Sequence, residues 1–229
     1  MKKRNILLVG LLFCMAVIFV LFLPATIRET KLTKQQEDRE ELLPALVKIR
    51  GNGVLGSGSI YAVTADSVVI VTAAHVLTGC EEAGCEEAGY AEAEVLFFGG
   101  KEVAAEISDI SEVADVGFLT VKVSDLSEKD REMLRRVRIR RKAYNRLGKN
   151  SLLYMVDLSE EGRIMEGGVV EKSKRLEEFS VPMIYADGAA KKGMSGSAVF
   201  DEEGYFVGIL VAATEYGELA ILPVTEIEY

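Results

Sequence analysis

One histidine, one aspartate and one serine occur in sequence contexts that could build a nucleophilic centre. His75 is the only histidine of the chain and ends an apolar run, and Asp115 begins a second one. Ser195 lies in a glycine-rich turn that precedes a third. A serine hydroxyl becomes an effective nucleophile when an imidazole removes its proton and a carboxylate holds that imidazole in the correct tautomer. Each residue alone also fits an ordinary core, cap or turn position, so acyl-transfer chemistry is predicted by the combination.

Short apolar and β-branched runs, divided by glycine and polar turns, must position these side chains. The runs recur about every ten residues, which is typical of an all-β barrel or sandwich. The sequence predicts strands at 45–50, 58–62, 67–72, 93–98, 103–107, 116–121, 152–156, 169–171, 181–185, 198–200, 205–211 and 219–223. The best helical stretch, 127–135, falls where a connection between two β halves would lie. The three residues can then meet in a cleft between the halves.

The composition excludes several classes of protein. The chain has 229 residues, of which 49% are hydrophobic, so it can bury a substantial core and is not a disordered protein. Its net charge of −9 argues against a nucleic-acid partner. Three cysteines cannot build a disulfide scaffold or a four-thiolate zinc site, and one histidine cannot support a multi-histidine metal centre. We therefore expect no metal and no cofactor.

The amino-terminal end has the pattern of a membrane anchor. Residues 6–23 carry no charge and follow Lys2, Lys3 and Arg4; at about 1.5 Å per residue, a helix of that length crosses the hydrocarbon core. The sequence predicts a cytoplasmic basic tip (1–5), a transmembrane anchor (6–24), a charged stalk (25–44) and a folded domain (45–229). The positive-inside rule places that domain outside the cytoplasm, at the cell membrane. A cleaved signal peptide, which would release a secreted protein, is the alternative.

A duplicated acidic segment interrupts the first β half. The sequence Gly-Cys-Glu-Glu-Ala occurs twice in succession over residues 79–88, which indicates an expanded surface loop. In an oxidising compartment, Cys80 and Cys85 could close a small disulfide ring. A metal site is the less favoured alternative.

A basic segment lies near mid-chain. Residues 129–149 hold ten Lys or Arg against two acidic residues. Val137 and Ile139 alternate with arginines, which fits a strand with one solvated face and no function. Contact with anionic lipid headgroups or an acidic wall polymer is the functional alternative.

Three ordered motifs resemble those of chymotrypsin-fold (trypsin-like) serine proteases. They are the histidine motif Thr72-Ala73-Ala74-His75, the aspartate motif Asp115-Val116-Gly117-Phe118-Leu119 and the serine motif Gly193-Met194-Ser195-Gly196. Gly56-Ser57-Gly58-Ser59-Ile60 is similar to a turn and first strand of the bacterial high-temperature-requirement and glutamyl endopeptidase branches. Segments 186–190 and 208–211 also resemble parts of those enzymes. The resemblance covers about residues 46–225, and its three motifs in this order are specific.

The resemblance implies a fold and a role for each residue. The fold is two antiparallel six-stranded β-barrels, here behind the N-terminal transmembrane helix, and no PDZ domain is expected. Carried over by position, His75 is the general base and acid, Asp115 orients it, and Ser195 is the nucleophile. The N–H groups of Gly193 and Ser195 form the oxyanion hole.

Departures from the family pattern bear on activation. Met194 replaces the aspartate that would pair with a newly freed amino terminus, and an Ile-Val-Gly-Gly activation sequence is absent. Both departures predict an enzyme that needs no trypsin-like zymogen cleavage.

The resemblance also implies a substrate site formed by Ala189, Lys191, Val211, Ala212 and Ala213. The small apolar wall at 211–213 predicts a modest uncharged residue before the cleaved bond. Lys191 and Lys192 could instead attract acidic groups. Leu210 replaces the histidine expected of glutamate-specific relatives.

We therefore expect a membrane-tethered, extracytoplasmic serine endopeptidase that acts on protein or peptide substrates through an acyl-enzyme. The alternative from another class is a non-catalytic, protease-like domain that binds peptides or senses the envelope. Such domains typically lose a catalytic residue, and this chain keeps all of them. An α/β-hydrolase esterase is excluded because that fold places its histidine after the serine. The cleavage preference and the oligomeric state stay open.

Overall fold

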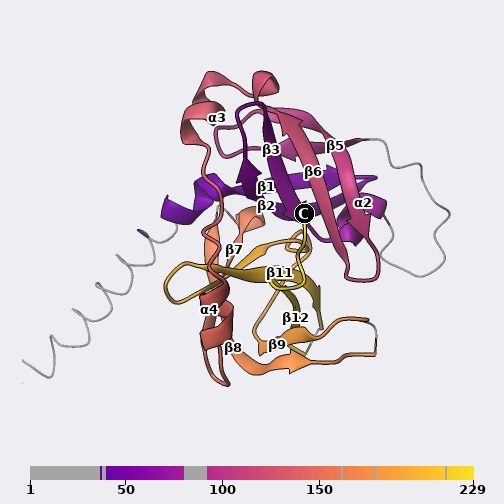
Figure 1. The fold of residues 1–229 in the computed structure, drawn as a ribbon, viewed down its shortest axis with the longest axis vertical. Helices are drawn as coiled ribbons and strands as arrows, with labels where there is room; N and C mark the ends of the chain where they lie inside the picture. Colours follow the sequence, from indigo (N-terminus) through magenta and orange to yellow (C-terminus); the bar gives the residue numbers. More distant parts are fainter. Residues whose placement is uncertain (1–36, 38–39, 80–91, 161, 178, 215) are drawn as a thin grey trace, which may run out of the picture. The chain divides into compact units, whose positions relative to one another are not determined.

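Two closed β-barrels of six strands each are formed between residues 46 and 223 (Figure 1). The computed structural model describes residues 37, 40–79, 92–160, 162–177, 179–214 and 216–229. The first barrel consists of β1 (Leu46–Gly51), β2 (Val54–Val63), β3 (Ser67–Thr72), β4 (Glu92–Leu96), β5 (Glu102–Ser111) and β6 (Val116–Lys122). Its strands follow the order β1-β2-β3-β6-β5-β4, and the pairings are antiparallel.

The second barrel repeats this arrangement with the other six strands. They are β7 (Leu152–Asp157), β8 (Arg163–Lys174), β9 (Met183–Asp187), β10 (Ala198–Asp201), β11 (Phe206–Ala213) and β12 (Glu218–Pro223). Their order is β10-β11-β12-β9-β8-β7, again with antiparallel pairs. Each of the twelve predicted strands overlaps one of the observed strands, so the predicted pair of six-stranded barrels is confirmed.

The hydrophobic pattern of each strand reflects how much of it is buried. In β5, Val103 and Ala105 are buried while Glu102 and Glu106 are exposed, as expected for a strand with one face on the core. In β3 the run Val68–Val71 is buried throughout. Strand β3 is therefore fixed on both faces, and it is the strand that leads to His75.

Short helices connect the strands. They are η1 (Leu43–Ala45), α2 (Ala74–Thr78), η2 (Val123–Asp125), α3 (Glu128–Met133), α4 (Arg141–Arg146) and η3 (Leu158–Glu160). Helix α3 confirms the helix predicted at 127–135, although it is shorter. Ser127 caps it by accepting a hydrogen bond from the backbone N–H of Asp130 at 3.0 Å.

The segment that links the two barrels is extended, but it is a strand of neither barrel. The alternation at Val137 and Ile139 predicted a strand, but the described segment forms only an isolated β-bridge between Ile139 and Phe206. The N–H of Val137 donates to Ile60 in the first barrel at 2.9 Å, and the carbonyl of Arg138 accepts from Phe206 in the second at 2.9 Å. The link is therefore hydrogen-bonded to both barrels.

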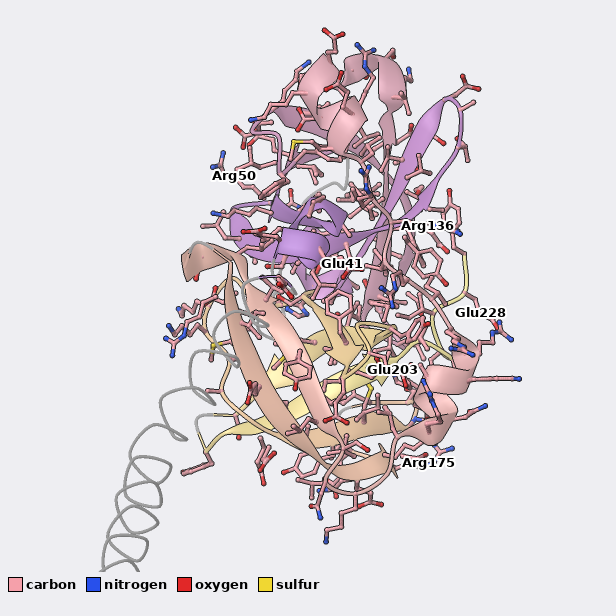
Figure 2. The ribbon with its side chains drawn as sticks, turned by 90° about the vertical axis from the view of Figure 1, so that its left-hand side faces the viewer. Glu41, Arg50, Arg136, Arg175, Glu203 and Glu228 are labelled. Atoms are coloured by element: carbon pink, nitrogen blue, oxygen red, sulfur yellow. The ribbon has the colours of Figure 1, made fainter. Side chains whose placement is uncertain are left out.

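Part of the basic segment is neutralised by neighbouring acids. Arg138 binds Glu41 at 2.7 Å and Arg146 binds Glu203 at 2.8 Å; both glutamates are labelled in Figure 2. The hydrogen bond from Arg146 lowers the pKa of the Glu203 carboxyl. Arg138 also lies over the ring of Tyr205, 4.8 Å from its centroid. Two of the ten basic residues of the segment, Arg138 and Arg146, are therefore paired with glutamates.

Aromatic contacts hold the barrels together. Tyr61 of the first barrel packs edge-on against Phe118 of the same barrel, with a centroid distance of 5.9 Å. It also packs edge-on against Phe206 of the second barrel, at 6.4 Å. The chain after β12 returns to the first barrel, where Tyr61 donates to the carbonyl of Ile227 and Tyr229 packs against Phe118. These contacts fix the relative position of the two barrels, which a site assembled from both requires.

The predicted membrane anchor (6–24), most of the predicted stalk (25–44), and both Cys80 and Cys85 lie outside the described residues. Within the part of the chain that the structure describes, no helix has the length and apolar character needed to cross a membrane.

Candidate active site

His75 lies on the single turn of α2, directly after β3. Helix α2 begins at Ala74, and its turn closes where the N–H of Gly79, at a φ of 76°, donates to the carbonyl of His75. Val76 and Leu77 are fully buried, which fixes the turn against the first barrel. The His75 side chain keeps 22% of its surface exposed. The imidazole is therefore held by its backbone and still open on one side.

Asp115 contacts His75 through three pairs of polar atoms. Its Oδ2 lies 2.8 Å and its Oδ1 3.1 Å from Nδ1 of His75, and Oδ1 also accepts the backbone N–H of His75 at 3.0 Å. Because a carboxylate only accepts, Nδ1 carries the proton and Nε2 keeps its lone pair. The pair therefore presents a histidine whose free nitrogen can take up a proton.

The backbone at Asp115 explains how the carboxylate reaches this position. Asp115 has a φ of 52°, a left-handed conformation that aspartate and asparagine tolerate better than most residues. It lies in the turn just before β6, and β6 pairs along its length with β3. The first barrel alone thus places both members of the pair.

Ser195 is presented by a tight turn before β10. The turn is closed by hydrogen bonds from Gly196 to the carbonyl of Leu210 at 2.8 Å and from Ser197 to the carbonyl of Met194 at 2.9 Å. Gly196 has a φ of 81°, and a Cβ there would lie 2.2 Å from the Ser57 carbonyl oxygen and 2.2 Å from Thr72 Oγ1. The turn therefore packs directly against the end of β3, three residues before His75.

The Ser195 hydroxyl and the His75 ring do not form a hydrogen bond in the described part of the chain. Catalytic hydrogen bonds of this kind are often long in unliganded enzymes and tighten when substrate is bound. The structure brings the serine turn and the histidine segment together.

A second turn, 191–194, carries the predicted oxyanion hole and is called the oxyanion turn below. The N–H of Met194 donates to the carbonyl of Lys191 at 3.1 Å, and Gly193 has a φ of 89°, as the third residue of a type II turn requires. The N–H groups of Gly193 and Ser195 donate to no acceptor among the described residues. Both are therefore available for a developing negative charge.

Ser57 holds this turn, a role that the sequence analysis did not assign. Its hydroxyl donates to the carbonyl of Gly193 at 2.7 Å, and its N–H donates to the carbonyl of Ser195 at 2.8 Å. Its own carbonyl accepts from Thr72 Oγ1 at 2.7 Å. The sequence feature that could have indicated this role is the position of Ser57 between Gly56 and Gly58, because glycine inside a strand often marks a close backbone approach.

Met194 stands where the family pattern has an aspartate that pairs with a freed amino terminus, and it packs as an apolar side chain. Its side chain is 1% exposed and belongs to the core of the second barrel. Its sulfur also accepts the N–H of Lys191 at 3.4 Å. The side chain of Lys191 lies 3.9 Å from the fully buried carboxylate of Asp157. The turn is therefore anchored at both ends without a free amino terminus.

The remaining predicted substrate residues follow β11 and the segment after β9. Val211 is buried, and Ala212 and Ala213 are exposed at the end of β11, where they no longer pair with β10. Beyond Leu210, β11 pairs only with β12, so one edge of it is free in the described structure. Ala189 is exposed between β9 and the Lys191 turn. No contact tests their binding role, which stays a prediction.

Comparison with known proteins identifies the family. Residues 53–209 match the family model of the trypsin-like peptidase domain. The chain therefore belongs to the trypsin-like peptidases and is a serine endopeptidase, as the motifs predicted. No curated protein sequence matches it.

Solved structures with the same fold are also serine proteases. The protease Rv3671c from M. tuberculosis, in an inactive form, is 17% identical with a TM-score of 0.62 over 82% of this chain and 88% of that one. A serine endoprotease from Yersinia pestis is 18% identical with a TM-score of 0.61; the match covers 82% of this chain and 62% of that protein. At these identities the likeness shows the two-barrel fold.

Proposed function

We propose that this chain is a membrane-tethered, extracytoplasmic endopeptidase whose catalytic residues are His75, Asp115 and Ser195. The observation that carries the proposal is the His75–Asp115 pair at the end of β3, with the Ser195 turn packed against that same strand end. An ordinary core histidine would not need a carboxylate on Nδ1, a partly exposed side chain and a serine turn beside it.

The proposed reaction proceeds in two halves. Ser195 Oγ attacks the carbonyl carbon of the peptide bond, and its proton passes to Nε2 of His75. The carbonyl oxygen, now an oxyanion, accepts hydrogen bonds from the N–H groups of Gly193 and Ser195. The C–N bond then breaks, His75 returns the proton to the leaving amine, and an acyl-enzyme remains. Water that His75 deprotonates hydrolyses the ester and restores Ser195.

The free edge of β11 supports an extended peptide as the substrate. A peptide can add to an unpaired strand edge through main-chain hydrogen bonds, and side-chain pockets then supply specificity. The wall formed by residues 211–213 is small, apolar and uncharged. We therefore propose a modest uncharged residue before the cleaved bond.

The membrane tether and the extracytoplasmic location rest on the sequence pattern of residues 1–24. An anchored chain should stay with the membranes after alkaline carbonate extraction. A membrane-impermeant fluorophosphonate should reach Ser195 in intact cells. Release by carbonate, or labelling only after lysis, would contradict this part of the proposal.

Hydrolysis of a peptide pool by the full chain tests the catalytic proposal. Ser195→Ala and His75→Ala should each remove nearly all turnover while the circular dichroism spectrum is unchanged. Ser59→Ala is the matched control, because its hydroxyl is buried without a hydrogen-bond partner in the described structure. Turnover that survives in either catalytic variant would contradict the assignment. A folded, inactive wild-type chain would favour the peptide-binding or sensing alternative.

A further inference from the structure

A pocket of about 590 Å³ adjoins the oxyanion turn. One wall comes from β1 and from residues 53–57 at the start of β2, and the opposite wall comes from Leu158, Ser159, Lys192 and Gly193. The pocket is therefore lined by both barrels and reaches the turn that carries Ser195.

Two lysines, Lys48 and Lys192, line this pocket together with Gly193. Lys192 precedes Gly193 directly. Lys48 pairs with Ser57 across β1 and β2, so the two side chains share a face of the sheet, and the Ser57 hydroxyl binds the Gly193 carbonyl. Both lysines are exposed, and both line the pocket. Their charges are therefore directed to one place beside the proposed catalytic turn.

Neither charge is neutralised. Lys48 and Lys192 form no ion pair with any residue that the structure describes, and the described lining of the pocket contains no carboxylate. Lys191 differs, because Asp157 lies beside its ammonium. In a chain with a net charge of −9, two unpaired cations in one pocket form a local region of positive potential.

The position of the pocket determines which half of a substrate it receives. Residues 211–213, which offer the strand edge for the acyl half, do not line it. Its lining instead includes Lys192 and Gly193, directly before the Ser195 turn. A peptide that pairs with β11 and passes Ser195 would continue into this pocket with the residues that follow the cleaved bond.

We infer that this pocket is a subsite for an acidic side chain of the leaving half of the substrate, bound by Lys48 and Lys192. The inference rests on the proposed function, because it takes Ser195 as the point of cleavage. The substrate class is thus a peptide or protein segment with Asp or Glu shortly after the cleaved bond. The exposed Leu55 at the rim adds apolar contact for the aliphatic part of such a side chain.

The test compares two peptide libraries that differ only by Glu or Gln at one fixed position, with the other positions randomised. The full chain is given an equimolar mixture, and mass spectrometry locates each cleaved bond. Cleavage that leaves the Glu within the first few residues after the cut should be favoured about tenfold over the same cleavage of the Gln library. Each exposed ion pair contributes about threefold to this preference for Glu. Lys48→Gln and Lys192→Gln should therefore each lower the preference about threefold, and the double variant should abolish it. High salt should also reduce the preference.

Lys122→Gln is the matched control. Lys122 is an exposed lysine that pairs with Ser67, at the end of β3 opposite to Thr72. This variant should keep the full preference for Glu. Equal cleavage of the two libraries, or a preference that persists in the double variant, would overturn the subsite.

Binding to the full-length Ser195→Ala variant separates this inference from the proposed function. Immobilised Ser195→Ala should retain the Glu library over the Gln library, and the Lys48→Gln/Lys192→Gln background should not. Selective retention together with an inactive wild-type chain would support the subsite and contradict the catalytic proposal. Cleavage without any acidic preference would contradict the subsite alone.

Discussion

Replacing Asp115 by asparagine tests how the histidine is prepared for catalysis. The position has a φ of 52°, which asparagine tolerates as well as aspartate, so the backbone should stay unchanged. The amide oxygen can still accept the His75 backbone N–H. The amide nitrogen, however, must then donate toward Nδ1, which forces the proton of the ring onto Nε2. The histidine can then no longer take the proton of Ser195.

The expected loss follows from the geometry of the pair. The carboxylate lies 2.8 Å from Nδ1, and both side chains are less than a quarter exposed. At an effective dielectric constant of about 20, it stabilises an imidazolium at that distance by about 6 kcal/mol. At about 1.4 kcal/mol per factor of ten, this corresponds to a loss of about 10⁴ in kcat. The tautomer argument gives the same order of magnitude.

The assay is kcat/KM on a cleaved peptide, with Asp109→Asn as the matched control. Asp109 is an exposed carboxylate on β5 that accepts the N–H of Ile110 and makes no contact with His75. Asp109→Asn should keep wild-type activity. If Asp115→Asn retains more than a tenth of kcat/KM, or if Asp109→Asn loses activity, the role assigned to Asp115 is refuted.

Four other substitutions test the turns around Ser195. Ser57→Ala removes the hydrogen bond to Gly193 and should lower kcat/KM about tenfold, with urea unfolding showing a loss of only about 1 kcal/mol; unchanged kinetics would contradict its positioning role. Gly196→Ala should fail to fold, since its Cβ would lie 2.2 Å from the Ser57 carbonyl oxygen. In Gly193→Ala the new Cβ meets no atom within 4 Å, so the variant should lose only about 1–2 kcal/mol of unfolding free energy. Equal stability of the two variants would contradict the packing of Gly196 against Ser57. Met194→Ala should destabilise the chain by about 2–5 kcal/mol in the same assay, and a loss below 1 kcal/mol would show that Met194 does not anchor the turn.

The strands were predictable because most of them bury a regular apolar face. Strand β8 was the poorest case: only 169–171 was predicted within Arg163–Lys174. Outside 169–171 only Gly167 is buried, so pairing with β7 and β9, and not hydrophobic burial, makes these outer parts strands. Helix α4 was missed for a similar reason, since only Ala143 within it is buried.

The proposed catalytic residues could be named from the sequence because each lies in a local motif, whereas the contacts of Ser57 could not. The bond from Ser57 to Gly193 joins residues 136 positions apart, and no local pattern shows which side chain will meet which carbonyl. The pocket charge was likewise only partly foreseen. The sequence shows Lys191 and Lys192 as neighbours, but Asp157 lies beside the first, and Lys48 from β1 lines the pocket with the second.

Covalent labelling of the full chain with a fluorophosphonate tests the central claim most directly. Such probes react with a serine only when a neighbouring base activates it. Peptide mass mapping should find one adduct, on Ser195, in the wild-type chain and none in His75→Ala. A folded wild-type chain that takes no label, or a His75→Ala variant that is labelled equally, would contradict an activated Ser195.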